Sequence, residues 1–193
     1  FAQIHYVEVY LEENYPSYSN PLCAGADLYI NGELLTEMVF PEGTTKINDA
    51  VFHGYSKLTK VVLPDTITEI GLASFGKCAN LVDINLPSSI THIGKWSFYG
   101  CSSLEEICLP NVEEILERAF YNCAKLKTVV LGKNVSTLQD KIFTNCGMLT
   151  KIVYDGTMES WASACGKYSI FYKPAQDIEI ECSDGTIILE ASV

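Results

Sequence analysis

The sequence predicts an α/β solenoid, in which short repeats stack and place a parallel sheet along one side. Three observations support this: a fixed repeat length, strand-like alternation at the start of each repeat, and a proline or glycine directly after it. The phrase F-x-x-C begins at Phe75, Phe98, Phe120 and Phe143, at spacings of 23, 22 and 23 residues. A constant period in this range is typical of stacked repeats, none of which buries its apolar face alone.

Each repeat opens with a segment that predicts a β-strand. Its first, fourth and sixth positions are apolar, and polar residues are more frequent between them, as in a strand with one buried face. The first position holds Leu35, Leu58, Leu81, Leu104, Leu126 and Leu149, the fourth Met38, Val61, Ile84, Ile107, Val129 and Ile152, and the sixth Phe40, Leu63, Leu86, Leu109, Leu131 and Tyr154. Prolines 41, 64, 87 and 110 follow and end the strands, because proline has no N–H. We expect Gly132 to end the fifth strand through its flexibility.

The remainder of each repeat predicts a second short extended segment and then a helical turn. The inward positions of the extended segment are Ile47, Ile70, Ile93, Ile115 and Leu138. Segments around the phenylalanines, such as ERAFYNC, have helical spacing but only about two turns, so they depend on packing. At the N-terminal end, residues 26–43 contain two apolar runs around Asn31-Gly32, which is typical of a type I′ hairpin.

The combined leucine, proline, Ile-Gly, Ala/Ser-Phe and cysteine columns resemble the BspA-type, or Treponema-type, leucine-rich repeats of bacterial cell-surface proteins over residues 35–157. They depart from the general leucine-rich pattern because only Asn111 and Asn134 stand at its asparagine position. The resemblance implies a solenoid with its sheet on the concave face, and parallel crossovers are right-handed as a rule. Residues 153–166 and 178–189 resemble the closing segment of the family, and residues 4–22 the tail of a preceding block.

The predicted organisation is one structural domain with three parts. An N-terminal segment and hairpin cap (1–34) precede about five full repeats and a partial sixth (35–157), and a C-terminal cap (158–193) follows. Caps are expected because an open solenoid end is both an apolar surface and a sheet edge. Since the chain begins at Phe1, we expect it to be a processed piece, and an internal module of a longer protein is one reading.

By resemblance, the chain is expected to be a secreted or cell-surface module that binds a host or bacterial surface protein or a glycan, without enzymatic activity. A structural spacer without a ligand is the alternative. The net charge of −11 and pI near 4.6 argue against nucleic acid as a partner, because that surface requires clustered Lys and Arg. No apolar run reaches the roughly 18 residues of a membrane span, so we expect no membrane insertion. We expect a monomer without cofactors.

The cysteines divide by position. Cys78, Cys101, Cys123 and Cys146 share one column, which Tyr55 occupies in the first repeat, and free cysteine is typically buried as a small hydrophobe. No C-x-x-C pair or histidine set completes a zinc site, and no basic residue recurs beside the column to activate a thiol. Cys108 lies at an outward strand position and is the expected reactive thiol. A disulfide between Cys165 and Cys182 is one alternative, which the sequence does not decide.

Catalytic patterns are absent from the sequence: no phosphate loop, G-x-S-x-G, H-E-x-x-H or calcium loop occurs. His5, His53 and His92 fall in different columns and are expected to face solvent. The candidate binding site is therefore the outward side of the predicted strands, namely Glu37, Lys60, Val62, Asp83, Asn85, Glu106, Cys108, Thr128, Val130 and Lys151, with Val39 and Val153 beside them. An ordinary half-exposed sheet is the competing reading. Trp96, Tyr99 and Tyr121 form an alternative aromatic patch on another side.

Overall fold

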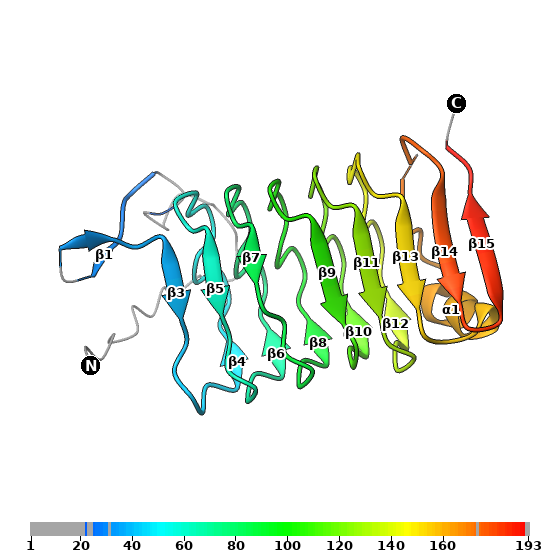
Figure 1. The fold of residues 1–193 in the computed structure, drawn as a ribbon, viewed down its shortest axis with the longest axis horizontal. Coiled ribbons are helices and arrows are strands. Elements are labelled where there is room, and N and C mark those ends of the chain that lie inside the picture. Colours follow the sequence, from blue (N-terminus) through cyan, green and yellow to red (C-terminus); the bar gives the residue numbers. More distant parts are fainter. Residues whose placement is uncertain (1–21, 23–24, 31, 173, 192–193) are drawn as a thin grey trace.

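The computed structural model describes residues 22, 25–30, 32–172 and 174–191. They form one elongated solenoid, with a hairpin at the N-terminal end and helix α1 (Met158–Cys165) at the other (Figure 1). The predictions for residues 1–21, Cys23 and Asn31 lie outside the described residues. Within the described part, no helix combines the length and the hydropathy that a membrane span requires.

The first segment of each repeat is a strand, as predicted. These strands are β3 (Glu37–Val39), β5 (Lys60–Val62), β7 (Asp83–Ile84), β9 (Glu106–Leu109), β11 (Thr128–Leu131) and β13 (Lys151–Tyr154). Adjacent strands pair in parallel and in register within two sheets, β3-β5-β7 and β9-β11-β13, the second of which continues into the C-terminal cap. We call their common solvent-facing side the strand face.

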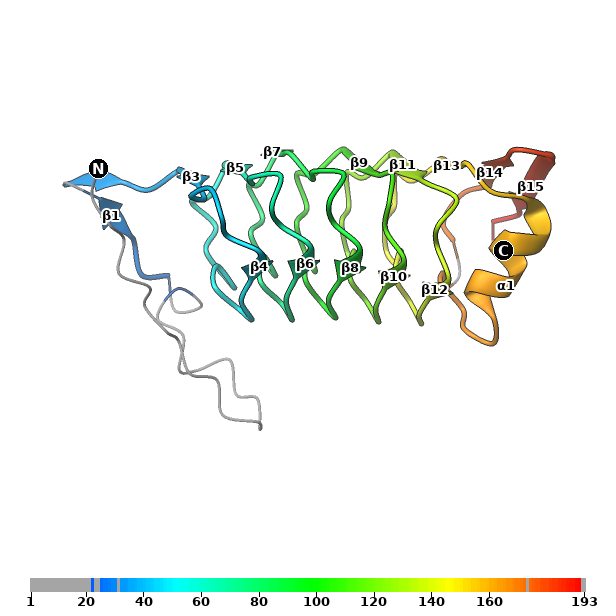
Figure 2. The same cartoon turned by 90° about the horizontal axis from the view of Figure 1, so that it is seen from below.

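The second extended segments form another parallel sheet, which is continuous over five repeats. Its strands are β4 (Lys46–Ile47), β6 (Glu69–Ile70), β8 (His92–Ile93), β10 (Glu114–Ile115) and β12 (Thr137–Leu138). Figure 2 shows the two rows of strands running along opposite edges of the stack. In the part of the chain that the structure describes, strand-rich repeats with one helix at the C-terminal end confirm the solenoid prediction.

The segments around the phenylalanines are turns, so the prediction of helical turns was wrong. Each contains a residue in the left-handed region, where an α-helix cannot continue: Ala50, Ala73, Trp96, Arg118 and Lys141 have φ between 51° and 58°. Their N–H groups bond to the next repeat instead of within a helix. For example, the Ala73 N–H donates to the Lys95 carbonyl and the Phe75 N–H to the Ser97 carbonyl, both at 2.8 Å. We call this row of turns, residues 50–54, 73–77, 96–100, 118–122 and 141–145, the turn ladder.

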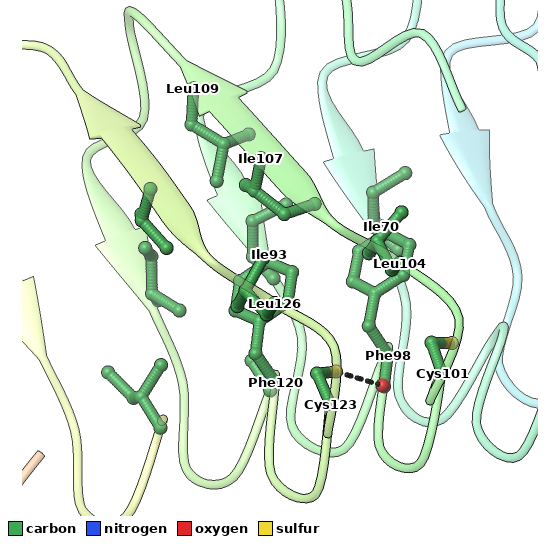
Figure 3. Packing of buried hydrophobic residues seen from close by; sticks show 14 of the residues in the cluster. Ile70, Ile93, Phe98, Cys101, Leu104, Ile107, Leu109, Phe120, Cys123 and Leu126 are labelled. Atoms are coloured by element: carbon green, nitrogen blue, oxygen red, sulfur yellow. Dashed lines mark hydrogen bonds between the residues drawn. The ribbon is translucent and has the colours of Figure 1, made fainter. Parts of the chain in front are cut away.

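The core between these three sides is built from the predicted apolar columns. The phenylalanines stack from repeat to repeat, with ring centroids 5.1–6.1 Å apart and interplanar angles of 17° or less. Figure 3 shows Phe98 and Phe120 stacked beneath Ile70, Ile93 and the strand residues of their repeats. Stacked aromatic pairs of this kind add to the free energy of burial by about 0.5–1.5 kcal/mol each.

Gly132 has a different role from the one predicted. It has no positive φ, and a Cβ built on it would lie 1.6 Å from the carbonyl oxygen of Pro110. Its N–H donates to the Leu109 carbonyl at 3.2 Å. Glycine is required here because the neighbouring backbone leaves no space for a side chain, and not because the chain must be flexible.

Both ends of the stack are covered. At the N-terminal end, β1 (Tyr29–Ile30) and β2 (Glu33–Leu34) pair antiparallel, as the hairpin prediction requires. The Tyr55 hydroxyl donates to the Leu35 carbonyl at 2.7 Å and accepts from the Leu28 N–H at 3.3 Å, which ties this hairpin to the first repeat.

At the C-terminal end, β14 (Ile178–Cys182) pairs in parallel with β13, and β15 (Gly185–Leu189) pairs antiparallel with β14. Thr157 caps α1 by accepting from the Ser160 N–H at 3.1 Å. Trp161 is buried against Tyr154, and Phe171 continues the phenylalanine stack 5.9 Å from Phe143. The apolar last repeat is thereby shielded from solvent.

Candidate functional site

The strand face presents its side chains in two lanes that run along the stack. Because the strands are in register, equivalent repeat positions are cross-strand neighbours. The first lane contains Glu37, Lys60, Asp83, Glu106, Thr128 and Lys151. The second contains Val39, Val62, Asn85, Cys108, Val130 and Val153. All ten residues of the candidate site therefore lie on one face, as the alternation predicted.

Three of the charged residues of the first lane, Lys60, Asp83 and Lys151, take part in ion pairs. The Lys60 ammonium lies 2.8 Å from the Asp83 carboxylate, and the hydrogen bond between them raises the pKa of Lys60. Lys151 forms a 2.6 Å ion pair with Glu181 of β14, and this hydrogen bond likewise raises the pKa of Lys151. Both pairs are exposed, so solvent screens them. They reduce the net charge that the face offers to a ligand.

The second lane is mostly apolar, with Asn85 as its exception. Val39 is 65% exposed and Cys108 is exposed, while Val62, Val130 and Val153 are partly buried. The Asn85 amide is engaged within the protein: its Oδ1 accepts from the Leu63 N–H at 2.7 Å and its Nδ2 donates to the Leu63 carbonyl at 2.8 Å. Asn85 thus replaces part of the backbone pairing between β5 and β7 with side-chain bonds.

The candidate site is divided between repeats 3 and 4, which begin at Leu81 and Leu104. β7 and β9 belong to different sheets, although β8 and β10 behind them are paired. The inward residues of the third repeat, Ile84 and Leu86, are only partly buried, in contrast to their equivalents in the flanking repeats. Glu37, Lys60, Val62, Asp83 and Asn85 therefore lie on one side of an interruption and the other five residues on the opposite side.

The four column cysteines are buried, and each thiol makes the same bond. The S–H groups of Cys78, Cys101, Cys123 and Cys146 donate to the carbonyls of Phe52, Phe75, Phe98 and Phe120 at 3.1–3.2 Å. Figure 3 shows one of these bonds, from Cys123 to Phe98. Burial raises the pKa of the Cys101 and Cys123 thiols far above the ordinary range. The column therefore packs and holds neighbouring turns together.

The remaining described cysteines are also free thiols. Cys165 and Cys182 are not bridged, and burial raises the pKa of Cys165 to about 11. Cys108 is the exposed one, on the strand face, as predicted. Among the residues that the structure describes, no three His, Cys, Asp or Glu side chains gather to hold a metal ion.

The two described histidines lie apart from each other in the structure. His92 is exposed, with its Nε2 3.7 Å from a Glu114 carboxylate oxygen. His53 is partly buried instead of facing solvent, because Gly76 of the next repeat packs against its ring. Burial, and secondarily the Lys77 charge, lowers the pKa of His53.

A second group of surface side chains lies on the turn ladder. Trp96, Tyr99 and Tyr121 contact one another, with ring centroids 5.2–6.4 Å apart. The Arg118 guanidinium lies 4.8 Å from the Trp96 ring centroid, and the Lys77 ammonium 6.0 Å from that of Tyr99. The three aromatic residues were evident from the sequence, but the two cations were not, because Arg118 and Lys77 stand in different columns that contain mostly other residue types.

Comparisons with known proteins agree with this architecture. The family described as BspA type leucine rich repeat region matches residues 25–150 in six copies. A leucine rich cell surface protein from Faecalibacterium prausnitzii is similar in structure, with 30% sequence identity and a TM-score of 0.64 over 67% of this chain and 34% of that chain. A Treponema pallidum leucine rich repeat protein has 29% identity and a TM-score of 0.60 over 70% of this chain and 73% of that chain.

The pneumococcal vaccine antigen PcpA shares the fold at 24% identity and a TM-score of 0.58, over 68% of this chain and 33% of that chain. The present chain thus spans about one third of the F. prausnitzii and pneumococcal proteins. No curated protein matched its sequence. The family match covers well over half of the chain and coincides with the repeats seen in the structure, so the chain belongs to the BspA-type leucine-rich repeat family.

Proposed function

We propose that this chain is a non-enzymatic interaction module at the bacterial cell surface, which binds a protein or a glycan through its rigid solenoid surface. The observation that carries the proposal is the strand face, which presents two rows of side chains in register over repeats 1 to 3 and again over repeats 4 to 6. Such a surface is preorganised, so a ligand that spans several repeats orders few protein groups on binding.

The family supports both parts of the proposal. Leucine-rich repeats generally serve as interaction scaffolds without catalysis, and a fold by itself identifies a scaffold and not a partner. The F. prausnitzii relative is described as a cell surface protein, which supports a location outside the cell. The ten strand-face residues remain the proposed contact surface on this side, with the apolar lane of Val62, Cys108 and Val130 available for packing.

The test is a binding array of purified extracellular matrix proteins and glycans, probed with the wild-type chain and with the triple variant Lys60→Ala, Asp83→Ala, Glu106→Ala. We expect at least a tenfold loss of affinity for any ligand of the strand face. The triple variant Lys46→Ala, Glu69→Ala, Glu114→Ala is a matched control, because it removes the same charges and a 2.7 Å ion pair from the other sheet. Equal losses in both variants would move the site away from the strand face.

A spacer without a ligand is the second candidate. It is favoured by the Lys60–Asp83 and Lys151–Glu181 ion pairs, which neutralise charges on the strand face and link adjacent strands. A spacer would bind nothing on the array at any tested salt concentration. Its contribution would instead be mechanical, measured as a cooperative unfolding force when the folded chain is stretched between its ends.

A further inference from the structure

The aromatic group on the turn ladder has the composition of a protein-binding hot spot. We call Lys77, Trp96, Tyr99, Arg118 and Tyr121 the aromatic cluster. The three rings are partly exposed and lie outside the hydrophobic core. Trp, Tyr and Arg are the residues that dominate binding energy in interfaces, and they are effective where they cluster. The strand face carries no such anchors among its ten candidate residues.

The backbone conformation at Trp96 does not by itself favour a large side chain. Its φ of 58° lies in the left-handed region, where a bulky side chain carries a steric cost. The same column holds alanine in two repeats, Ala50 and Ala73. Since the turn accepts alanine and the Trp96 ring is not needed in the core, its place on the surface requires another explanation.

The charge of the cluster is opposite to that of the protein. The chain has 24 acidic and 13 basic residues, and Arg118 is its single arginine. The Glu117 carboxylate forms a 2.8 Å ion pair with the Arg118 guanidinium. Since a guanidinium has five N–H donors, others remain for a second carboxylate. Lys77 is exposed above Tyr99. The cluster is thus a cationic and aromatic area on an acidic molecule.

The ring geometry distinguishes between two kinds of partner. A sugar ring stacks on an open aromatic face, but Arg118 covers one face of Trp96, and Trp96 is at 84° to Tyr99 and 42° to Tyr121. The tilted rings form an uneven, partly exposed surface. Apolar side chains pack on such a surface, and carboxylates pair with the guanidinium and ammonium groups beside it.

From the composition, charge and geometry, we propose that the aromatic cluster binds an acidic, aromatic-containing segment of a partner protein. Carboxylates of the partner pair with Arg118 and Lys77, and its apolar side chains pack against Trp96, Tyr99 and Tyr121. This site is on a different side from the strand face and depends on the proposed function only in that the chain is a binding module.

The probe is a random copolymer of glutamate and tyrosine, compared with polyglutamate, polylysine and hyaluronan at low and physiological salt. Binding is followed by the protection of Trp96 from acrylamide quenching, because the other tryptophan, Trp161, is only 5% exposed. We expect the copolymer to bind more tightly than polyglutamate, and polylysine not to bind. Equal or tighter binding of hyaluronan at the same residues would replace the protein partner with an acidic glycan and overturn the proposal.

The variants use residues that the same columns already contain, so that folding is preserved. They are Trp96→Ala and Arg118→Ala, as at Ala50 and Ala73, and Lys77→Asn, as at Asn122 and Asn145. We expect the triple variant to bind the copolymer at least tenfold more weakly. Because Trp96 is lost in it, its affinity is measured by surface plasmon resonance.

The control variant Lys133→Ala, Lys167→Ala removes two exposed positive charges outside the turn ladder and should keep wild-type affinity. The strand-face triple variant should also keep it, so failure of the strand-face proposal is separable from failure of this one. Copolymer affinity that is unchanged in the cluster variant, or equally reduced in the control, would refute the aromatic cluster as a protein-binding site. Absence of copolymer binding by the wild type at low salt would refute it as well.

Discussion

The strand sheet differs on the two sides of the boundary between repeats 3 and 4. On the N-terminal side, β3, β5 and β7 have three, three and two residues, whereas β9, β11 and β13 have four each and continue into β14 and β15. The second sheet shows no such difference, because β8 and β10 pair across the same boundary. Strand pairing on one side of the solenoid can therefore end while the stack continues.

At this boundary, the turn side of the solenoid compensates for the interrupted strand pairing. The Phe98 and Phe120 rings are the closest pair of the stack, with centroids 5.1 Å apart and planes within 3°. The Trp96, Phe98 and Gly100 N–H groups also donate to the carbonyls of repeat 4. The comparison shows that the turn ladder and the aromatic stack can hold two repeats together where strand hydrogen bonds do not.

The largest expected effect is therefore at Phe98. Phe98→Ala should lower the free energy of unfolding by about 3–5 kcal/mol, because it removes a buried ring from between two others and leaves a cavity. Urea unfolding followed by circular dichroism measures this loss. Val82→Ala, at a position 59% exposed in the same repeat, is the control and should change stability by no more than about 0.5 kcal/mol. A melting temperature unaffected by Phe98→Ala would contradict the role of the stack.

The thiols report how far the interruption extends into the core. In the native protein, a maleimide should label Cys108 rapidly and leave Cys78, Cys101, Cys123 and Cys146 unmodified until the chain unfolds, as read by peptide mass spectrometry. Burial both covers these four thiols and, for Cys101 and Cys123, raises the pKa, so that the reactive thiolate is rare. If the interruption reached the turn side, Cys101 and Cys123 would react faster than Cys78 and Cys146.

Substitutions of Asn85 are expected to change the free energy of unfolding less, and they test whether this residue ends β7. Asn85→Ala removes two hydrogen bonds to Leu63 and should cost about 1–2 kcal/mol in urea unfolding. Asn85→Val introduces the residue that the same lane has in four other repeats, and should recover up to about 1 kcal/mol because valine favours strands. Slower hydrogen exchange in β7 and β9 of the valine variant would show that the strands have paired. Equal destabilisation by both substitutions would exclude Asn85 as the cause.

The smallest effect is expected from the exposed ion pairs, which occur on both sides of the boundary. The hydrogen bond from Lys127 lowers the pKa of Glu105, so its stabilising contribution is present above the unfolded pKa of about 4.3 and is lost as pH falls through the lower folded value. Lys127→Met should therefore be slightly less stable than wild type at pH 7 and equal to it at about pH 2. Lys60→Met removes the equivalent ion pair from the sheet β3-β5-β7, and its stability is compared at the same pH values. A large loss of stability in either variant would contradict the view that solvent screens these exposed ion pairs.

Much of the solenoid was predictable because its core is built from repeated apolar columns. The burial of Leu58, Ile107 and Phe98 follows from spacing alone, and so do the two lanes of the strand face. The turns were not predictable in the same way, because residues such as Ala73 and Lys141 give no local signal for a left-handed conformation. Hydrogen bonds to the next repeat impose it, and these bonds exist only in the stack.

The division of the candidate site was hidden for a related reason. Asn85 reads as one more outward strand residue, and only the structure reveals that its amide replaces backbone pairing at Leu63. The sequence does contain the shorter spacing of repeat 4, between Leu104 and Leu126. It does not show that Pro110 of that repeat lies against Gly132 and leaves no room for a side chain there.

The turn ladder also gives the molecule a direction. At each boundary from repeat 1 to repeat 5, three N–H groups of the earlier repeat donate to carbonyls of the later one, as from Ala73, Phe75 and Lys77. After the last repeat, the carbonyls of Ser169 and Ile170 take the place of the missing neighbour and accept from Lys141 and Phe143. One end of the ladder thus requires acceptors and the other requires donors. Because the C-terminal cap already supplies the acceptors, a further repeat could extend the ladder at this end only by displacing Ser169 and Ile170.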